Sequence, residues 1–364
     1  MRIGIDASRA VAAKSAGVGH YSRHLIRSLI ASEEHSYILY VNGAGQPDWA
    51  KRSNVQWCNI PLPRLWTHVR LSVEMALHRP DALFVPAHVL PPVHPPAAVV
   101  TIHDLGYLHY PAAHPPVQRL YLHWSTLWNA RTARVILADS QATIYDLSRY
   151  LRVPAARTVL AYPGVNEAFY PQPDSRVDEV RRHYRLPSSY LLYVGTIQPR
   201  KNVSRLLAAH ALVSKAPPLV LVGAPGWLSK GILRQVEAAG ERIRMLGYVP
   251  DDDLPALLTG AQALALPSLY EGFGIPALEA MACGTPVVAS RTSSLPEVVG
   301  DCGILVDPLS VDDIAHGLEL VCHNRELARH LGDSGRIRAR QFTWAACAQA
   351  ALTAIEKAYA NATI

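Results

Sequence analysis

The stretch SLYEGFGIPALEAMACGTPVV at residues 268–288 places a glycine turn between a short apolar strand and a helix. Gly272 and Gly274 lack a Cβ, which lets the backbone approach a ligand closely. Free amides at the start of the helix would bind an anion, helped by the helix dipole. Glu271 precedes the turn and Glu279 follows it within the first helical turn, and carboxylates accept hydrogen bonds from sugar hydroxyls. The segment therefore predicts a site for a sugar joined to phosphate.

A second segment, GTIQPRKN at residues 195–202, directly follows a strand expected at Tyr190–Val194. Arg200 and Lys201 are adjacent cations at a strand end, which suits them to a diphosphate. They would stabilise the negative charge that develops as a glycosidic C–O bond breaks. Asn202 is expected to cap the helix that follows.

Short apolar runs alternate with amphipathic stretches along the chain, and the alternation restarts near residue 190. This pattern predicts an α/β protein with two Rossmann-like, doubly wound domains, whose strand carboxyl ends would face a central cleft. The expected strands are Arg2–Asp6, Tyr37–Val41, Ala82–Val85, Ala98–His103, Val135–Ala138, Tyr190–Val194, Leu219–Val222, Ile243–Leu246, Ala263–Leu266 and Val287–Ala289. The expected helices are Gly19–Ile30, Val203–Val213, Lys230–Ala239, one starting near Asp253, and Pro276–Ala282.

Charged and proline-rich stretches mark the domain boundaries. Residues 1–170 are expected to form the acceptor-binding domain and residues 188–342 the nucleotide-sugar-binding domain. Residues 171–187 contain three prolines among charges and are expected to be the linker. A helix at about 343–360 is expected to pack back on the first domain. Two further proline-rich stretches, Pro86–Pro96 and Pro111–Pro116, are expected to be loops.

The charge of the chain is unevenly distributed. The 364 residues carry 35 Lys+Arg and 29 Asp+Glu, a net charge of +6. Residues 1–170 hold 16 of these bases and 10 of the acids, whereas the remainder holds 19 of each, so the whole excess lies in the first half. A basic first domain suits an anionic membrane surface. Nucleic acid is not an expected partner, because Lys and Arg do not cluster among aromatic residues.

The composition also bounds the compartment and the class. A hydrophobic content of 49% excludes a disordered protein. The five cysteines are scattered without a CxxC pair, which argues against a disulfide framework or a cysteine zinc site and favours a reducing cytoplasm. The N-terminus is typical of a strand rather than of a signal peptide, and no apolar run approaches the roughly 18 residues of a membrane span.

The spacing from Glu271 to Glu279 resembles the E-x7-E signature of retaining family 4 glycosyltransferases, which have the two-domain GT-B architecture. The similarity extends from GIDASR near the start to the FTW of residues 342–344. It implies that Glu271 binds hydroxyls of the donor sugar and that Glu279 binds the nucleotide ribose. It also implies that Arg200 and Lys201 bind the diphosphate. The turn that would hold sugar and phosphate is Glu271, Gly272, Phe273, Gly274 and Ile275.

Other segments resemble further parts of the family's sites. AGVGH at residues 16–20, with Gly17 and Gly19, resembles the loop that covers donor and acceptor. His103, in the sequence HDL at a strand end, resembles the family's sugar-contacting histidine. Acceptor-side candidates are Asp104 and Asp139, and further donor-side candidates at strand ends are Gly195, Gly223 and Tyr248.

The resemblance implies a retaining hexosyltransferase that uses a nucleoside diphosphate sugar and a glycan or lipid-linked glycan acceptor. The motifs are most similar to those of bacterial polysaccharide mannosyl- and rhamnosyltransferases, so GDP-mannose is the first expected donor, with UDP-sugars and dTDP-rhamnose left open. The alternatives are a GT-B nucleotide-sugar epimerase, against which the E-x7-E turn argues, and a non-catalytic protein that binds an anionic ligand. An NAD oxidoreductase lacks support, because Ser22 replaces the third glycine of the fingerprint.

No cofactor or metal is expected. Asp251–Asp253 precedes a helix, where capping and the dipole explain acidic residues, and no zinc-binding histidine spacing occurs. The protein is expected in the cytoplasm, with peripheral contact to the inner face of the cytoplasmic membrane. The candidate contact consists of Arg64, Arg70 and Arg79 around Leu65, Trp66, Val69, Leu71 and Val73, with a solvated basic face over a buried helix stripe as the alternative.

Overall fold

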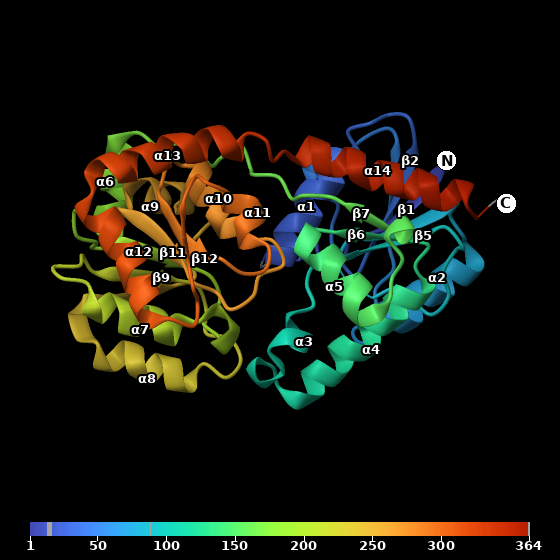
Figure 1. The fold of residues 1–364 in the computed structure, drawn as a ribbon. Coiled ribbons are helices and arrows are strands. Elements are labelled where there is room, and N and C mark those ends of the chain that lie inside the picture. Colours follow the sequence, from blue (N-terminus) through green and yellow to red (C-terminus); the bar gives the residue numbers. More distant parts are fainter. Residues whose placement is uncertain (13–16, 88, 363–364) are drawn as a thin grey trace. The chain divides into compact units, whose positions relative to one another are not determined.

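The computed structural model describes residues 1–12, 17–87 and 89–362, which form two compact units (Figure 1). The first unit consists of Met1–Leu105, Leu120–Gly164 and Thr343–Ile364. The second consists of Gly106–Arg119 and Val165–Phe342. The C-terminal segment thus belongs to the same unit as the N-terminus.

A seven-stranded parallel sheet forms the centre of the first unit. Its inner strands are buried along almost their whole length, which is why they are continuous apolar runs in the sequence. The strand order runs β3 (Val55–Asn59), β2 (Ser36–Val41), β1 (Arg2–Asp6), β4 (Ala82–Val85), β5 (Ala98–Ile102), β6 (Val135–Ala138), β7 (Thr158–Leu160). The order reverses between β1 and β4, which makes the carboxyl ends of these strands a topological switch point.

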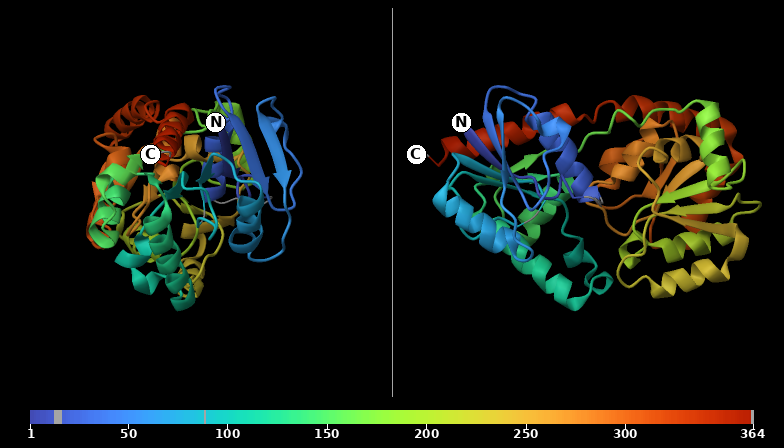
Figure 2. Two further views of the ribbon diagram at one scale, coloured as in Figure 1. Left: turned by 90° about the vertical axis from the view of Figure 1, so that its right-hand side faces the viewer. Right: turned by 180° about the vertical axis from the view of Figure 1, so that it is seen from behind.

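Helices cover the first sheet, and the C-terminal helix is one of them. Helix α14 (Trp344–Ala360) packs beside α1 (Gly17–Leu29) against the strands (Figures 1 and 2). Ile355 and Leu352 of α14 are buried in the same core as Leu25 of α1. This part also contains a π-helix at Trp66–Arg70 and the α-helices α2 (Leu71–Leu77), α5 (Gln141–Leu151) and α4 (Pro116–Thr132). The first four residues of α4 are assigned to the second unit.

The second unit contains a six-stranded parallel sheet. Its order is β10 (Ile243–Gly247), β9 (Leu219–Val222), β8 (Leu191–Val194), β11 (Ala263–Leu266), β12 (Val287–Ser290), β13 (Ile304–Val306). Here the order reverses between β8 and β11. The helices are α3 (Gly106–His109), α6 (Asp174–His183), α7 (Val203–Leu212), α8 (Lys230–Ala238), α9 (Leu254–Gly260), α10 (Ile275–Ala282), α11 (Leu295–Val299), α12 (Val311–His323) and α13 (Arg325–Ala339).

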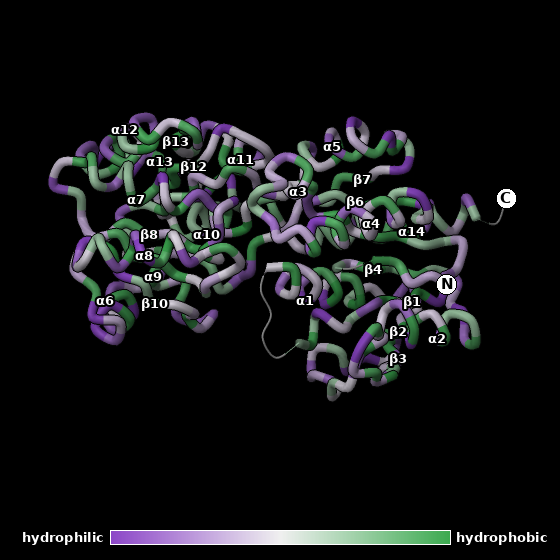
Figure 3. The backbone as a smooth tube through the Cα atoms, turned by 90° about the horizontal axis from the view of Figure 1, so that it is seen from below, coloured by the Kyte–Doolittle hydropathy of each residue, from purple (hydrophilic) through white to green (hydrophobic). Residues whose placement is uncertain are grey.

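The expected linker at residues 171–187 differs in the structure, because it contains helix α6. Val177 and Val180 on one face of α6 are buried, and α6 packs against α9 within the second unit. Most other α6 residues are polar, as Figure 3 shows, so the sequence has the composition of a linker. The two buried valines nevertheless hold the helix to the second unit. The stretch Pro111–Pro116, expected to be a loop, holds a 3-10 turn at Pro111–Ala113 and the start of α4.

Candidate active site

Two loops meet at the switch point of the second sheet, one after β8 and one after β11. The amide of Leu269 donates to the carbonyl of Arg200 over 2.9 Å. The Nη1 of Arg200 donates in return to the carbonyl of Tyr270 over 2.5 Å. Because the carboxyl ends of neighbouring parallel strands share one edge, residues seventy positions apart become neighbours.

Glu271 and Lys201 form a buried ion pair at this edge. Nζ of Lys201 lies 2.7 Å from both carboxylate oxygens, and the hydroxyl of Ser268 donates to Oε1 over 2.6 Å. Arg200 adds a second cation, with Nη1 at 3.7 Å from Oε2. Burial alone would raise the pKa of Glu271, but the two cations and the hydrogen bonds outweigh it and hold that pKa below its usual value. The carboxylate is therefore ionised and can accept hydrogen bonds from a hydroxylated ligand.

Asn202 joins the same loops, but not in the way expected. It stands at the N-terminus of α7 with φ of 62° and makes no capping hydrogen bond, so the expected cap is wrong. Its buried amide instead donates to the carbonyls of Pro267 and Pro308 over 2.8 and 2.7 Å. The left-handed backbone, which Asn tolerates better than most residues, turns the side chain toward β11 and β13.

The glycine turn follows Glu271 directly. Gly274 has φ of 105°, and a Cβ there would lie 2.5 Å from Leu295, so the position requires glycine. The hydroxyl of Ser294 donates to the carbonyls of Glu271 and Phe273 and fixes the turn. The ring of Phe273 is buried edge-on against another aromatic ring, so only its backbone remains for a ligand. Gly272 and Ile275, which flank these two positions, complete the predicted set.

Glu279 is the fifth residue of α10 and lies in its second turn, rather than in the first turn as expected. Burial, assisted by repulsion from Asp251, raises the pKa of Glu279 to about 8. Within the part of the chain that the structure describes, its carboxylate has no hydrogen-bond or ion-pair partner. Glu271 and Glu279 therefore differ in environment, since only the first has cations beside it.

Three glycines line the neighbouring strand ends. A Cβ on Gly223 would lie 2.1 Å from the carbonyl oxygen of Gly195, and both glycines have positive φ. Gly223 also donates to the carbonyl of Gly247 over 2.7 Å. Tyr248, the next residue, is 72% exposed, so its side chain stands in solvent at this edge. Backbone atoms rather than side chains thus form the floor beside the ion pair.

In the first unit, His103 is held by two acceptors. Nδ1 lies 2.6 Å from Oδ2 of Asp139 on the adjacent strand end, and Nε2 lies 3.0 Å from the carbonyl of Pro86. Burial opposes the charged ring, but Asp139 outweighs it and raises the pKa of His103. The ring of Tyr21 packs edge-on at 4.8 Å. The orienting carboxylate is therefore Asp139, thirty-six residues away, and not the neighbouring Asp104.

Both ring nitrogens of His103 are thus engaged within the protein. The family resemblance assigns this histidine to a sugar contact, and the structure shows a ring that would have to exchange a partner to make one. No feature of the sequence pairs residues 103 and 139. Only the shared edge of β5 and β6 brings them together.

Comparisons with known proteins identify the family. The family model for glycosyl transferases group 1 matches residues 178–338, and that for Glycosyltransferase Family 4 matches residues 15–169. The O-antigen chain mannosyltransferase B of Escherichia coli is 40% identical over 261 residues, covering 69% of this chain and 68% of that protein. The chain is a family 4 glycosyltransferase. As a member of this family it is a hexosyltransferase.

Other relatives cover less of their own length. An MMP α-(1→4)-mannosyltransferase of Mycolicibacterium hassiacum is 47% identical over 240 residues, which are 64% of this glycosyltransferase and 56% of the relative. The serotype-specific mannosyltransferase WbdA of Escherichia coli is 32% identical over 231 residues, 60% of this chain but only 28% of WbdA.

Solved structures agree on the GT-B fold. Sucrose-phosphate synthase from Thermosynechococcus elongatus has a TM-score of 0.79 at 24% identity, covering 99% of this chain and 100% of the other. WaaG, a glycosyltransferase involved in lipopolysaccharide biosynthesis, has a TM-score of 0.74 at 18% identity, with full coverage of both chains. The two parallel-sheet units of this glycosyltransferase match the fold expected from its sequence.

The predicted glycine loop of the glycosyltransferase is helical where it is described. Gly17 and Gly19 lie in the first turn of α1, and among the described residues no heavy atom lies within 4 Å of a Cβ placed on Gly17. Ala16 lies outside the described residues. The two glycines therefore belong to a helix N-terminus rather than to an extended loop.

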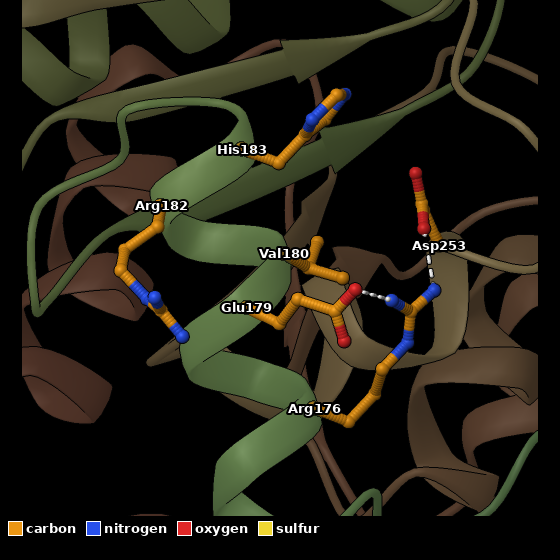
Figure 4. Close-up of a pocket in the computed structure, with 6 residues that line it drawn as sticks. All are labelled: Arg176, Glu179, Val180, Arg182, His183 and Asp253. Atoms are coloured by element: carbon orange, nitrogen blue, oxygen red, sulfur yellow. Dashed lines mark hydrogen bonds and ion pairs between the residues drawn. The ribbon is translucent and has the colours of Figure 1, made fainter.

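The acidic run before α9 has a tertiary explanation. Asp253 makes no capping hydrogen bond, so the expected cap is wrong. Its carboxylate accepts from Nη2 of Arg176 over 2.6 Å and from the hydroxyl of Tyr184 over 2.8 Å. Figure 4 shows Arg176 reaching both Glu179 and Asp253 beside a cavity of about 360 Å³. Asp253 thereby ties α9 to α6.

Among the described residues, one group gathers three metal-type ligands. Glu34, His35 and Glu356 place one ligand atom each within 4.8 Å of one another. Both glutamates are exposed, and His35 lies 3.1 Å from Glu356, so an ion pair at the surface accounts for the group. The absence of a metal requirement stays a prediction. None of the helices described in this glycosyltransferase has the length and apolar character to cross a membrane.

Proposed function

We propose that this family 4 glycosyltransferase transfers mannose, with retention, from GDP-mannose to a glycan or lipid-linked glycan of a cell-surface polysaccharide. The observation that carries the proposal is the buried Lys201–Glu271 pair beside Arg200 at the switch point of the second sheet. Two of the relatives, an O-antigen chain mannosyltransferase and a serotype-specific mannosyltransferase, support mannose as the transferred sugar.

The arrangement supports separate binding of the diphosphate, sugar, ribose and base of the donor by different residues. The diphosphate would take up the positive charge of Arg200 and Lys201, whose side chains are each less than 15% exposed. Low solvent access strengthens such contacts as the leaving group gains charge. As Lys201 turns to the diphosphate, Glu271 would accept hydrogen bonds from sugar hydroxyls in its place. Glu279 would accept from the ribose, and the glycine floor would surround the base.

The reaction would proceed on one face of the sugar. The bond between the anomeric carbon and the diphosphate oxygen breaks, and a bond from the acceptor oxygen to that carbon forms on the same face. The acceptor proton passes to the departing diphosphate oxygen, which yields GDP and the extended glycan. Arg200 and Lys201 would stabilise the charge that develops on the diphosphate.

The basic first half supports work at a membrane surface. All six net positive charges of the chain come from residues 1–170. Arg64 lies beside the exposed Leu65 and Val69, a mixture that suits anionic headgroups and the interface below them. We therefore propose a peripheral location on the cytoplasmic face of the membrane.

The first experiment is a thermal-shift panel of GDP, UDP and dTDP with their sugars, followed by transfer assays with labelled GDP-mannose. Ligand that binds only the folded state raises Tm in proportion to its affinity. We expect the largest shift with GDP or GDP-mannose. A larger shift with UDP or dTDP would contradict the proposed donor, and no shift with any nucleotide would contradict the site.

A further inference from the structure

The first sheet has a cavity of about 520 Å³ at its own carboxyl edge. It is lined by Ser8 and Arg9 after β1, Asn42 after β2, residues 63–68 after β3, and Val89 after β4. This is the side of the switch point between β1 and β4, where ligands of doubly wound sheets bind. Its size lies within the usual range of small-molecule pockets.

The lining has the chemistry of an anion-binding site with hydroxyl partners. Arg9, Arg64 and His68 line the cavity together with the hydroxyl-bearing residues Ser8 and Thr67. Neither Asp nor Glu is present among the described residues that line it. Among those residues, Arg64 has no ion-pair or hydrogen-bond partner. A phosphate beside sugar hydroxyls would complement this set.

The wall that carries Arg64 is fixed in place. The side chain of Asn42 donates to the carbonyl of Leu62 over 3.0 Å and accepts from its amide over 2.9 Å. Leu65 has φ of 56°, a left-handed conformation that is rare for leucine, and a π-helix begins at the next residue. The indole of Trp66 is buried and donates to the carbonyl of Ile60 over 2.7 Å. Strained backbone and π-helices cluster at functional sites, and here both occur in one wall of the cavity.

The lining also includes exposed apolar and aromatic residues, which are called the rim below. Leu65 is 65% exposed and Tyr121 of α4 is 52% exposed, and both line the cavity. His68 packs edge-on against Tyr121, which joins the two elements at the rim. Beyond them the exposed surface continues with Val69 and, on α4, Trp124. Exposed Trp and Tyr beside aliphatic side chains are typical of surfaces at the membrane interface.

We propose that this cavity binds the phosphate and adjoining sugar of a lipid-linked acceptor, while the lipid lies along the rim formed by Leu65, Tyr121 and Trp124. The proposal rests on the proposed glycosyl transfer, for which it names the acceptor site and its chemical class. The basic and hydroxyl-bearing residues of the lining bind the sugar phosphate, and the apolar rim binds the lipid to which it is attached. A soluble sugar phosphate would use only the basic and hydroxyl-bearing residues.

The test compares Arg64→Glu with Arg52→Glu, which reverses the charge of an exposed arginine that does not line the cavity. The probe is a mannose disaccharide linked by diphosphate to a polyprenyl chain, in vesicles of phosphatidylethanolamine and phosphatidylglycerol. We expect Arg64→Glu to raise KM for this probe about tenfold or more, with the Arg52→Glu value unchanged. An unchanged KM in Arg64→Glu overturns the proposal.

Two further measurements separate its parts. Trp124→Ser should weaken use of the lipid-linked probe but not binding of mannose 1-phosphate, with Leu212→Ser, at an exposed leucine of α7, as the control. Equal use of the probe by Trp124→Ser and the native protein overturns the role of the rim. The thermal shift with GDP should be the same in native protein and in Arg64→Glu. If GDP stabilises neither protein, the proposed function is wrong. If GDP stabilises both proteins and the KM for the lipid-linked probe is unchanged in Arg64→Glu, only the proposed acceptor cavity is wrong.

Discussion

The carboxyl edges of the two sheets share a topology but differ in how they are held. At the second edge, Lys201 and Glu271 pair, Arg200 bonds to Tyr270, and Asn202 bonds across two loops, so side chains and backbone form one fixed network. At the first edge, four loops and helix α4 line an open cavity, and Arg64 in its lining has no hydrogen-bond or ion-pair partner among the described residues. A site fixed before binding suits a constant ligand such as a nucleotide diphosphate, and an open one suits a ligand that varies between enzymes.

The two edges also differ in their buried acid–base pairs. Glu271 has two cations beside it and its pKa is held low, so it is a carboxylate ready to accept hydrogen bonds. His103 has a single carboxylate partner, which raises the pKa of the ring. The Glu271 pair, at the second edge, presents negative charge to a ligand. The His103–Asp139 pair, at the first edge, fixes a strand end. Changes at the second edge should therefore affect every substrate, whereas changes at the first should depend on the acceptor.

The largest effect is expected from Glu271→Gln. The substitution preserves shape but removes the charge that faces Lys201 and the proposed sugar contact. We expect kcat/KM to fall by roughly 10²–10³-fold, equivalent to about 3–4 kcal/mol of transition-state stabilisation. The measurement is transfer of labelled mannose at saturating acceptor.

The control for this variant is Glu241→Gln, at an exposed glutamate outside the site, which should retain full activity. Thermal unfolding of both variants shows whether lost activity reflects lost structure. Full transfer by Glu271→Gln would contradict the proposed role of the second edge, and with it the contrast between the edges.

Gly223→Ala should disrupt the glycine floor beside that pair. The Cβ would meet the carbonyl oxygen of Gly195 at 2.1 Å, and φ of 139° is unfavourable for alanine. We expect a loss of about 3 kcal/mol or more in unfolding free energy, measured by urea denaturation.

Gly231→Ala in α8 provides the matched comparison. It has no heavy atom within 4 Å of its Cβ position and an ordinary helical setting. Alanine there should leave stability unchanged or raise it by up to about 1 kcal/mol. Equal losses in the two variants would mean that the floor at Gly223 is not a close backbone contact.

The second edge was also the part most accessible from sequence. Inner strands such as β8 and β11 are buried on both faces, so their apolar runs predict them, and their carboxyl ends then place Arg200, Lys201 and Glu271 together. The edge strands β3, β7 and β13 are only partly buried. Polar residues interrupt β3 and begin β7, and β13 is an apolar run of only three residues, so none has the long apolar run that would have indicated a strand.

Partnerships across the fold could not be predicted. The pairing of His103 with Asp139, and of Asp253 with Arg176, joins residues 36 and 77 positions apart, and no local pattern encodes such contacts. Local rules in fact gave the wrong answer for Asn202 and Asp253, because tertiary donors and acceptors displaced the caps that the sequence favours. The cavity at the first edge depends on the positions of four loops and helix α4 at once, which composition does not supply.

Asn202→Ala and Asn202→Gly would measure how much the loop network contributes. Both lose the bonds to Pro267 and Pro308, and alanine also keeps the unfavourable positive φ. We expect losses of about 2 kcal/mol for glycine and about 1 kcal/mol more for alanine. Urea denaturation gives both values. A smaller loss for alanine than for glycine would show that backbone strain at this residue is negligible.

The smallest effect, about 1–2 kcal/mol after allowing for solvent screening, concerns the pH dependence of Glu279. Its pKa is about 8 in the folded protein, against about 4.3 in an unfolded chain, so over this window the folded state retains a proton that the unfolded state has released. Stability contributed by this group is therefore complete below about pH 4.3 and is lost as the pH rises through 8. The glutamine in Glu279→Gln does not titrate, so the free energy of unfolding of the variant should rise relative to that of the native protein between about pH 5 and pH 9. If the two free energies change in parallel with pH, the raised pKa of Glu279 is contradicted.

Nucleotide binding should show the opposite trend at the same residue, which separates it from Glu271. A ribose hydroxyl donates best to an ionised carboxylate, so GDP should bind the native protein more tightly at about pH 9 than at about pH 7. Glu279→Gln should bind it weakly with little change over that range. Glu271, whose pKa is already held low by Lys201 and Arg200, stays ionised throughout and should add no pH dependence of its own. If native affinity for GDP does not change over this pH range, Glu279 does not contact the ribose, and only Glu271 of the two glutamates has a role at the donor.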